Sequence, residues 1–359
     1  MADHPFLLAC RKQPVPHVPV WYMRQAGRYQ PEYRKLRERH TLLEICRNPE
    51  LCREVTCLPV EQLGVDAAIL FSDIMVPLGP MGVDFDIVES VGPVTHNPVR
   101  SAADVARLRV FHPEEELPYV AESVRLITRD LHVPLIGFSG APFTLASYII
   151  EGRPSRDYLR TKRLMWSEPD VWRSLMEKLA EVIVRYLRMQ IAAGAAAVQV
   201  FDSWVGSLAP EDYRVHVLPA MRRIFSGIAD TEVPAIYFGV GTGELLPLFA
   251  ETGASVIGID WRVSIAAARR RTQGRVAIQG NLDPALLLAP WPEIQRRARQ
   301  IIDEGLEAPG FIFNLGHGVV HHQPPVEVDT LRRLTDFVHE YSADRIAEST
   351  RVTARRDEP

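Results

Sequence analysis

Cysteine is scarce in this sequence and confined to one end. The four cysteines, Cys10, Cys46, Cys52 and Cys57, lie in the first sixth of the 359 residues, and none forms a C-x-x-C pair. A disulfide framework would be denser and spread along the chain, so we expect reduced thiols. Because no cysteine follows Cys57, a zinc site built from several thiolates is also difficult to assemble.

Long apolar runs are missing as well. No stretch reaches the ~20 residues that a membrane-spanning helix needs. The first ten residues contain no basic n-region, and their apolar run is too short for a signal peptide. We therefore expect a cytoplasmic protein with no membrane partner.

Positive charge is not in excess. The 41 Lys and Arg residues against 45 Asp and Glu give a formal net charge of −4. This balance argues against a nucleic-acid partner held by general positive charge. An anionic small molecule would instead need positive charge that is concentrated in a pocket.

What the chain does contain is a series of short apolar runs separated by amphipathic helical patterns. Nearly continuous apolar runs of about five residues are typical of parallel strands that are buried on both faces. The predicted strands are residues 18–22, 67–71, 134–138, 198–201, 235–238, 255–259, 276–279 and 311–314. About eight strand–helix units predict a single-domain (β/α)8 TIM barrel over residues 1–341, with a doubly wound open sheet as the alternative.

Several helices have end signals in the sequence. Asn48-Pro49-Glu50 supplies an N-cap, a proline at the first helical position and an early acid. From Pro169, apolar residues recur at helical spacing until Gly194 provides a stop. Further helices are predicted to begin at Pro210 and at Asp283-Pro284.

Two regions depart from this rhythm. Residues 77–113 are rich in Val, Gly, Pro and Asp and lack helical periodicity, which predicts an inserted hairpin or arm between the second and third strands. Residues 342–359 alternate charged and small residues, which predicts a frayed C-terminal tail.

Polar residues follow at least six of the predicted strands. In a barrel of this type the catalytic groups lie just after the carboxyl ends of the strands, so these residues should converge on one mouth. They are Met23-Arg24-Gln25-Ala26-Gly27-Arg28-Tyr29, Ser72-Asp73, Ser139-Gly140 with Tyr148 further on, Asp202-Ser203-Trp204, Asp260, Gly280-Asn281 and Gly316-His317-Gly318.

Arg24 and Arg28 flank a turn of small residues after the first predicted strand. A guanidinium group is a planar fork that pairs with a carboxylate through two hydrogen bonds and keeps its charge. Gly27 would let a ligand approach the backbone closely. These residues are therefore candidates for anion binding, and two solvated surface arginines are the alternative.

Asp73 follows a wholly apolar strand, which places it at the edge of the core. An unpaired buried charge is costly, so an acid at this position needs a partner. We expect a functional carboxylate, with a salt bridge to an arginine or a cap on the next turn as the alternatives. Tyr148 and Ser203 are weaker candidates, since either hydroxyl could simply bond the backbone.

The histidines and glycines near the C-terminal strands offer two further signals. His317 lies between two glycines, and His321 and His322 follow it closely, but no acidic third ligand is near, so we expect no metal. The roles of His321 and His322 are left open. The loop at residues 239–244 fails the G-x-G-x-x-G pattern at Glu244 and does not predict a nucleotide site.

Taken together and in order, these segments resemble the uroporphyrinogen decarboxylase family. The resemblance runs from about Phe6 to about Tyr341, and its most specific stretch is the first one. The matching segments are Met23-Arg24-Gln25-Ala26-Gly27-Arg28-Tyr29 with Pro31-Glu32-Tyr33-Arg34, Phe71-Ser72-Asp73-Ile74, the stretch from Gly137 to Leu145, Tyr148 with Glu151-Gly152, Phe201-Asp202-Ser203-Trp204, Gln279-Gly280-Asn281-Leu282-Asp283-Pro284, and Asn314-Leu315-Gly316-His317-Gly318. The pair His321-His322 departs from the family pattern before the Pro-Pro.

The resemblance implies a cofactor-free, cytoplasmic (β/α)-barrel homodimer. It implies conversion of uroporphyrinogen III into coproporphyrinogen III, in which four acetates become methyl groups and four CO₂ are released. The substrate-binding residues that it implies are Arg24, Gln25, Ala26, Gly27, Arg28, Asp73, Tyr148, Ser203 and His317, with Asp73 hydrogen-bonding the pyrrole nitrogens.

The residue types suit this chemistry. A substrate with eight carboxylates needs fixed positive forks, which Arg24 and Arg28 supply. Decarboxylation needs an electron sink, and a pyrrole protonated on a ring carbon is one. A carboxylate near the ring nitrogens, Asp73, would stabilise that cation. The donor of the ring proton stays open between Arg24, Tyr148 and a bound water.

Two other functions compete with this one. A corrinoid-dependent methyltransferase of the same superfamily would activate a thiol on zinc, which the position of the cysteines makes difficult. A non-catalytic tetrapyrrole-binding barrel is compatible with the fold, but a pure carrier would not need Asp73 at the centre of the ring.

Overall fold

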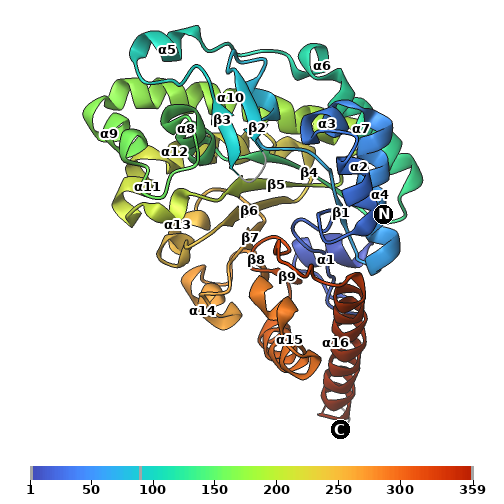
Figure 1. The fold of residues 1–359 in the computed structure, drawn as a ribbon. Coiled ribbons are helices and arrows are strands. Elements are labelled where there is room, and N and C mark those ends of the chain that lie inside the picture. Colours follow the sequence, from blue (N-terminus) through green and yellow to red (C-terminus); the bar gives the residue numbers. More distant parts are fainter. Residues whose placement is uncertain (1–2, 89–90, 357–359) are drawn as a thin grey trace.

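The computed structural model describes residues 3–88 and 91–356. Its main sheet has seven parallel strands in the order β1-β4-β5-β6-β7-β8-β9, and this curled sheet is surrounded by helices (Figure 1). Strands β2 and β3 form a separate antiparallel pair. The strands are β1 Ala68–Ile69, β2 Phe85–Val88, β3 Gly92–Thr95, β4 Leu135–Gly140, β5 Ala197–Asp202, β6 Ala235–Gly239, β7 Val256–Gly258, β8 Ala277–Leu282 and β9 Phe311–Leu315.

Helices alternate with the strands along most of the chain. The α-helices are α1 Pro5–Cys10, α2 Pro31–Arg37, α3 Leu42–Arg47, α4 Pro49–Leu63, α5 Ala102–Arg107, α6 Pro113–Glu116, α7 Pro118–Asp130, α8 Pro142–Glu151, α9 Leu159–Ser167, α10 Pro169–Ala193, α11 Pro210–His216, α12 Leu218–Ser226, α13 Leu246–Phe249, α14 Ile265–Arg271, α15 Trp291–Leu306 and α16 Val328–Arg356. Short 3-10 helices are η1 Val76–Leu78, η2 Val205–Ser207, η3 Ala229–Thr231, η4 Gly243–Leu245 and η5 Pro284–Leu288.

The predicted end signals act as expected. The Asn48 side chain accepts hydrogen bonds from the amides of Glu50 and Leu51 and begins α4. Helix α10 ends before Gly194, which has a φ of +125°. Asp283 caps a helix as well, but it is the 3-10 helix η5.

The central strands are buried on both faces, which explains why their sequences are mostly apolar. Every residue of β4, β6, β8 and β9 is buried. Helices cover the outer face of the sheet, and α10 buries one stripe that includes Trp172, Leu179 and Tyr186. The carboxyl ends of all seven strands therefore point toward one rim, because every pairing in this sheet is parallel.

The first predicted strand, residues 18–22, is not a strand, and we call this segment the seam. It makes one isolated parallel bridge, between Val20 and Phe313 of β9. On its other side the Val20 carbonyl accepts the amide of Asp66, just before β1. Pro19 has no N–H to donate, which limits the ladder. The seam therefore lies between the two edges of the sheet with few backbone bonds to either.

Residues 77–113 hold the β2–β3 hairpin, together with η1 and α5. The hairpin joins α8 through the amide of Thr95, which donates to the Gly152 carbonyl at 2.8 Å. The segment also contains a helix that its sequence periodicity did not indicate, because the Ser101 hydroxyl accepts the Asp104 amide and begins α5. This short capped turn is below the length at which apolar periodicity is visible.

The predicted tail does not begin at residue 342. Helix α16 continues to Arg356 and extends away from the sheet (Figure 1). Leu331, Leu334, Thr335 and Val338 are buried at helical spacing, and Ser342 continues the same face. The Ser342 hydroxyl also accepts the Val18 amide at 2.8 Å, so it fastens α16 to the seam.

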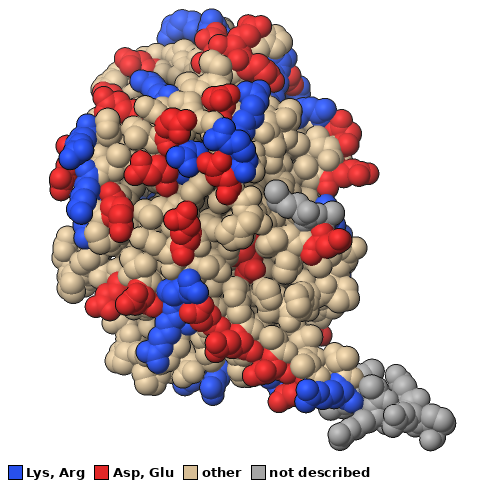
Figure 2. All heavy atoms as spheres, turned by 90° about the vertical axis from the view of Figure 1, so that its right-hand side faces the viewer, with Lys and Arg blue, Asp and Glu red and all other residues tan. Residues whose placement is uncertain are grey.

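The surface charges match the balanced composition. On the face shown in Figure 2, acidic and basic side chains are interspersed. None of the helices in the described ranges is long and apolar enough to cross a membrane.

Candidate active site

Three of the predicted site residues, Asp73, Tyr148 and His317, lie near Arg24. The positive charge of Arg24 lowers the pKa of all three. For Asp73 and Tyr148 it opposes the effect of burial, whereas for His317 burial and Arg24 both lower the pKa. Arg24 comes from the loop after the seam, Asp73 from the segment after β1, Tyr148 from helix α8 and His317 from the loop after β9. The rim where the strands end therefore brings together groups that lie almost 300 residues apart in the sequence.

The backbone presents Arg24 in an unusual conformation. Its φ is +58°, in the left-handed region, and its side chain is exposed to the mouth. Gly318 packs directly against the aliphatic part of Arg24, so that a Cβ at position 318 would collide with it. The Val319 amide donates to the Met23 carbonyl at 2.9 Å, which ties the two loops together.

Asp73 lies at the turn that leads into η1 and is partly exposed. Its Oδ1 accepts the Met75 amide at 2.8 Å, so the predicted cap on the next turn is present. No other side-chain hydrogen bond and no ion pair of Asp73 is found in the described part of the chain. Burial raises the pKa of Asp73, and the Met75 bond and Arg24 only partly oppose this. Oδ2 thus keeps its capacity to accept a hydrogen bond.

Tyr148 comes from α8 and packs edge-on against Trp204, with 5.9 Å between the ring centroids. Burial, followed by the negative charge of Asp73, raises the pKa of Tyr148 to about 12. The phenol therefore keeps its proton throughout the neutral range.

His317 is held between glycines for steric reasons. A Cβ at Gly316 would lie 2.5 Å from the Trp261 amide nitrogen, and one at Gly318 would strike Arg24. Burial, followed by Arg24, lowers the pKa of His317 to about 4. The imidazole is therefore neutral at pH 7 and can both donate and accept a hydrogen bond.

The remaining predicted residues of the Arg24 loop differ in what their side chains can offer. Gln25 is buried, and its amide is fully used: Oε1 accepts the Tyr22 amide and Nε2 donates to the Ala67 carbonyl. It therefore bonds the seam to the residue that precedes β1. Ala26 and Gly27 are half-buried and offer only their backbone, and the Gly27 amide already donates to Gln30. Ser203 is half-buried after β5.

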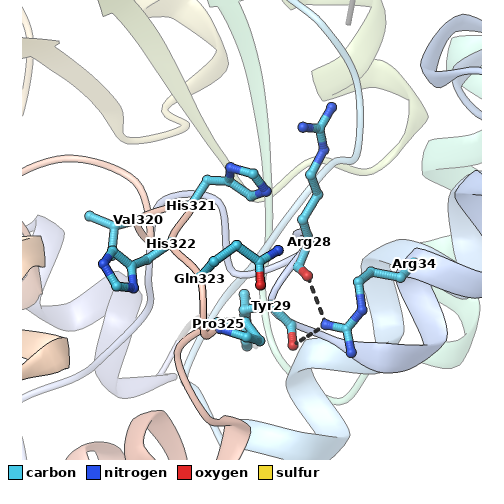
Figure 3. Close-up of a pocket in the computed structure, with 8 residues that line it drawn as sticks. All are labelled: Arg28, Tyr29, Arg34, Val320, His321, His322, Gln323 and Pro325. Atoms are coloured by element: carbon cyan, nitrogen blue, oxygen red, sulfur yellow. Dashed lines mark hydrogen bonds between the residues drawn. The ribbon is translucent and has the colours of Figure 1, made fainter. Parts of the chain in front are cut away.

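A cavity of about 200 Å³ adjoins Arg28 (Figure 3). Its lining residues are Arg28, Tyr29, Arg34, Val320, His321, His322, Gln323 and Pro325. The Arg34 guanidinium donates to the carbonyls of Arg28 and Tyr29, both at 2.9 Å, and so fixes the Arg28 loop. His321 points toward the side of Arg28, whereas Nδ1 of His322 lies 3.0 Å from the Pro324 carbonyl oxygen.

Sequence reasoning had left Arg34 and Gln323 without a role and had left His321 and His322 open. Arg34 lies within the Pro31-Glu32-Tyr33-Arg34 stretch, but its contacts are with the backbone of an earlier turn. No local pattern signals such a contact.

Two other carboxylates at the strand ends, those of Asp202 and Asp260, have their hydrogen-bond partners within the protein. Asp202 is fully buried and accepts the hydroxyls of Thr144 and Tyr237, each at 2.7 Å. Asp260 accepts the Gly241 amide and both the amide and the guanidinium of Arg262. These carboxylates hold the loops of the rim in place.

Comparison with known proteins gives a consistent result. The family model described as uroporphyrinogen decarboxylase (URO-D) matches residues 1–341. The chain is 56% identical over 339 residues to a uroporphyrinogen decarboxylase of Geobacillus sp. (strain WCH70), covering 94% of this chain and 97% of that protein. A uroporphyrinogen decarboxylase of Bacillus cytotoxicus is 54% identical over 343 residues, covering 95% and 97%.

This chain belongs to the uroporphyrinogen decarboxylase family. Among solved structures, a methyltransferase from Methanosarcina mazei superposes with a TM-score of 0.78 at 19% identity, covering 93% of this chain and 97% of that one. A B12-independent methionine synthase from Shewanella sp. W3-18-1 superposes with a TM-score of 0.55 at 11% identity, covering 87% and 91%. At such identities these likenesses show a shared fold and nothing about the reaction.

The four cysteines of this uroporphyrinogen decarboxylase family member are not all remote from the rim, because the Cys52 thiol donates to the Phe71 carbonyl and Cys46 lies close enough to Asp73 for that negative charge to raise its pKa. They are free thiols on α1, α3 and α4. Burial raises the pKa of Cys52 and of Cys57 to about 11, and it raises the pKa of Cys10 and Cys46 as well. None of the four is therefore a thiolate at neutral pH.

Proposed function

We propose that the protein is a carboxy-lyase that converts uroporphyrinogen III into coproporphyrinogen III and four CO₂. The observation that carries this proposal is the carboxylate of Asp73, which keeps one oxygen without a hydrogen bond in the described structure beside Arg24 and Tyr148. Membership of the uroporphyrinogen decarboxylase family supports it.

The substrate would be held by its carboxylates and its pyrrole N–H groups. The proposed binding residues are Arg24, Gln25, Ala26, Gly27, Arg28, Asp73, Tyr148, Ser203 and His317. The cavity beside Arg28, at about 200 Å³, is below the ~300–1,000 Å³ typical of whole small-molecule sites. It therefore suits one carboxylate arm, while the macrocycle lies across the open mouth.

The reaction can proceed without an external electron sink. A proton added to the pyrrole α-carbon next to an acetate-bearing carbon creates a cation delocalised onto the ring nitrogen. The C–C bond to the carboxylate then breaks, its electron pair forms an exocyclic methylene, and CO₂ leaves. Protonation of that methylene gives the methyl group, and loss of the added ring proton restores the pyrrole.

Asp73 would stabilise the cation by accepting the pyrrole N–H through its open Oδ2. A charge placed in advance where the transition state develops the opposite charge is often the largest catalytic contribution. Arg24 and Tyr148 are the proton-bearing side chains beside Asp73, and either of them or a bound water would deliver the ring proton. We propose that the reaction needs no cofactor and no metal at this rim.

The alternatives have weaker support. A corrinoid-dependent methyltransferase would need a thiolate-rich zinc site, whereas burial raises the pKa of all four cysteines and keeps them as neutral thiols. A non-catalytic tetrapyrrole-binding barrel would have no use for an open carboxylate whose ionised form burial disfavours.

We also propose how the barrel closes, where its inserted arm lies and how the protein assembles. The seam would occupy the eighth strand position and close the sheet into a (β/α)8 barrel, with the hairpin segment as an inserted arm and residues 1–341 as one catalytic unit. A cytoplasmic homodimer is proposed from the family resemblance.

Anaerobic incubation with uroporphyrinogen III, followed by oxidation and counting of carboxylates in the products by mass spectrometry, tests the function. We expect a final product with four carboxylates and intermediates with seven, six and five. Binding of the substrate without any loss of carboxylate would support the carrier and refute the decarboxylase.

A further inference from the structure

Three side chains meet at the opposite rim of the sheet from Asp73. His17 precedes the seam, Asp66 precedes β1, and His339 lies on α16. Nε2 of His17 is 3.0 Å from Asp66 Oδ1, and Nε2 of His339 is 2.7 Å from Asp66 Oδ2. One ligand atom of each residue lies within 4.8 Å of the other two. No other group of this kind occurs in the described ranges.

This set of donors suits a zinc ion. Two imidazoles, one carboxylate and a water are a common tetrahedral zinc set. Ligands at about 2.0–2.2 Å from a tetrahedral ion lie about 3.3–3.5 Å apart. The His–Asp separations of 3.0 and 2.7 Å are shorter than this, because each is now a hydrogen bond. Small side-chain rotations would open them to the zinc distance.

The surroundings hold the carboxylate and leave the ion a route in. The Val20 amide donates to Asp66 Oδ2 at 2.7 Å, which is the kind of outer contact that orients a metal ligand. The Asp66 side chain is only 9% exposed, whereas His17 and His339 are 24% and 26% exposed. Solvent can therefore deliver the ion and supply a water as the fourth ligand.

We propose that His17, Asp66 and His339 form a zinc site that fastens the seam. Each imidazole would coordinate through Nε2 as the neutral base, with its proton on Nδ1, and no redox step is involved. The ion would link three segments separated by 49 and 273 residues in the sequence. The seam has one bridge to β9, so a cross-link at its entrance would stabilise the place where the sheet is weakest.

The test uses the full chain, treated with a chelator and then titrated with zinc chloride. We expect one zinc per chain by calorimetry and a melting temperature that rises until the site is saturated. In His17→Gln and His339→Gln, zinc affinity should fall by at least about tenfold. Glutamine retains an N–H near the position of Nε2, so it preserves the hydrogen bond to Asp66 while removing the imidazole ligand.

His96→Gln is the matched control. Nε2 of His96 is also 3.0 Å from an aspartate oxygen, in Asp86 of the hairpin, but that pair has no second histidine. It should keep the zinc affinity of the parent. The proposal is overturned if the parent binds no zinc, or if both glutamine variants bind it as tightly as the parent.

Cobalt chloride gives a second readout that needs no variant. Tetrahedral coordination by nitrogen and oxygen predicts visible d–d absorption without a sulfur-to-metal charge-transfer band. A charge-transfer band would place the ion on a cysteine and overturn the proposal even if neither glutamine variant folds.

Discussion

Asp73 lies after β1 and Asp202 is the last residue of β5 in the same sheet, yet their surroundings differ. Asp202 uses both carboxylate oxygens, one for the Thr144 hydroxyl and one for the Tyr237 hydroxyl. Asp73 uses one oxygen for the Met75 amide and keeps the other available. Burial raises the pKa of both, to about 6 for Asp202.

The difference indicates which carboxylate acts on a substrate. A buried acid whose hydrogen-bonding capacity is filled by the protein has little left to offer a ligand. A partly buried carboxylate with one oxygen that accepts no hydrogen bond from the protein costs stability, unless a bound ligand donates a hydrogen bond to it. Asp202 therefore organises the rim, and Asp73 is available for chemistry.

The largest predicted effect comes from Asp73→Asn. We expect kcat/KM to fall by about 10²–10³, the scale of losing one preorganised electrostatic group. The melting temperature should not fall, because burial already disfavours the ionised form of Asp73. The matched Asp202→Asn variant should lose less than about tenfold in kcat/KM, since its carboxylate does not face the substrate. Steady-state kinetics and thermal melts on both variants make the comparison, which fails if the two losses are equal.

Gly318→Ala tests whether the packing of Gly318 against Arg24 positions the Arg24 side chain for activity. The added Cβ would collide with the Arg24 side chain and displace it from Asp73 and Tyr148. A displacement of about 1 Å can cost up to about 10² in rate, and we expect a loss of about 10–10² in kcat/KM. Gly79→Ala is the control, because its Cβ would meet only ordinary contacts at 3.8 and 3.9 Å. Equal activities of the two variants would show that the position of Arg24 does not matter.

Arg28→Lys tests the cavity. A lysine keeps the charge but cannot reproduce the two-pronged hydrogen bonding of a guanidinium, so we expect KM to rise by about tenfold. Arg53→Lys is the control, because Arg53 pairs with Glu50 and Asp130 at the surface. A KM that stays at the parental value in Arg28→Lys would remove Arg28 from the set of substrate-binding residues.

The dependence of activity on pH should separate Asp73 from His317. The proposed mechanism needs ionised Asp73, whose pKa is raised, so activity should be lost as pH falls through that raised value. His317 has a pKa lowered to about 4 and stays neutral across pH 5.5–8, so it should add no inflection there. The acidic limb should persist in His317→Gln. Its disappearance would assign the limb to the histidine.

Asp202 gives the corresponding test on stability. Its pKa is raised to about 6, so its protonated form contributes stability that is complete below the unfolded value of 3.8 and is lost as pH rises through 6. The Asp202→Asn variant has no carboxyl group at this position, so its stability does not fall in this way as pH rises. Its melting temperature should therefore rise relative to the parent between pH 4 and pH 7, and a constant difference would contradict the assignment.

The smallest expected effect is that of chelation. We predict that EDTA changes kcat/KM by less than about twofold, because the proposed reaction uses the pyrrole as its own sink. If the protein carries zinc at Asp66, the same treatment should lower its melting temperature. Loss of turnover on chelation, with recovery on adding zinc, would place a metal at the reaction.

The sequence predicted the buried strands well because their physics is local. A continuous apolar run such as that of β6 has few ways to be satisfied other than burial on both faces. The seam has a similar run, but Pro19 interrupts its donors, and this warning was present in the sequence. The course of α16 beyond residue 341 was missed because charge composition outweighed the helical spacing that ends at Ser342.

The candidate site was predictable only as a list of positions. The order of strand ends placed both Asp73 and Asp202 at the mouth, and only Asp73 was singled out, from its apolar strand and the family resemblance; the partners that distinguish the two are non-local. Tyr237 lies 35 residues from Asp202, and Thr144 lies 58 residues from it. The same limit hid the structural use of Gln25 and the support that Arg34 gives to the Arg28 loop.

In the proposed mechanism the charge of Asp73 acts on the chemical step and not only on binding. Single-turnover decarboxylation by excess Asp73→Asn enzyme, under anaerobic conditions, separates this step from binding. We predict a rate constant lower by about 10²–10³ at saturating enzyme, with the enzyme concentration for half-maximal rate changed by less than about tenfold. A near-parental rate constant with strongly weakened binding would show that Asp73 only holds the substrate and would contradict the account.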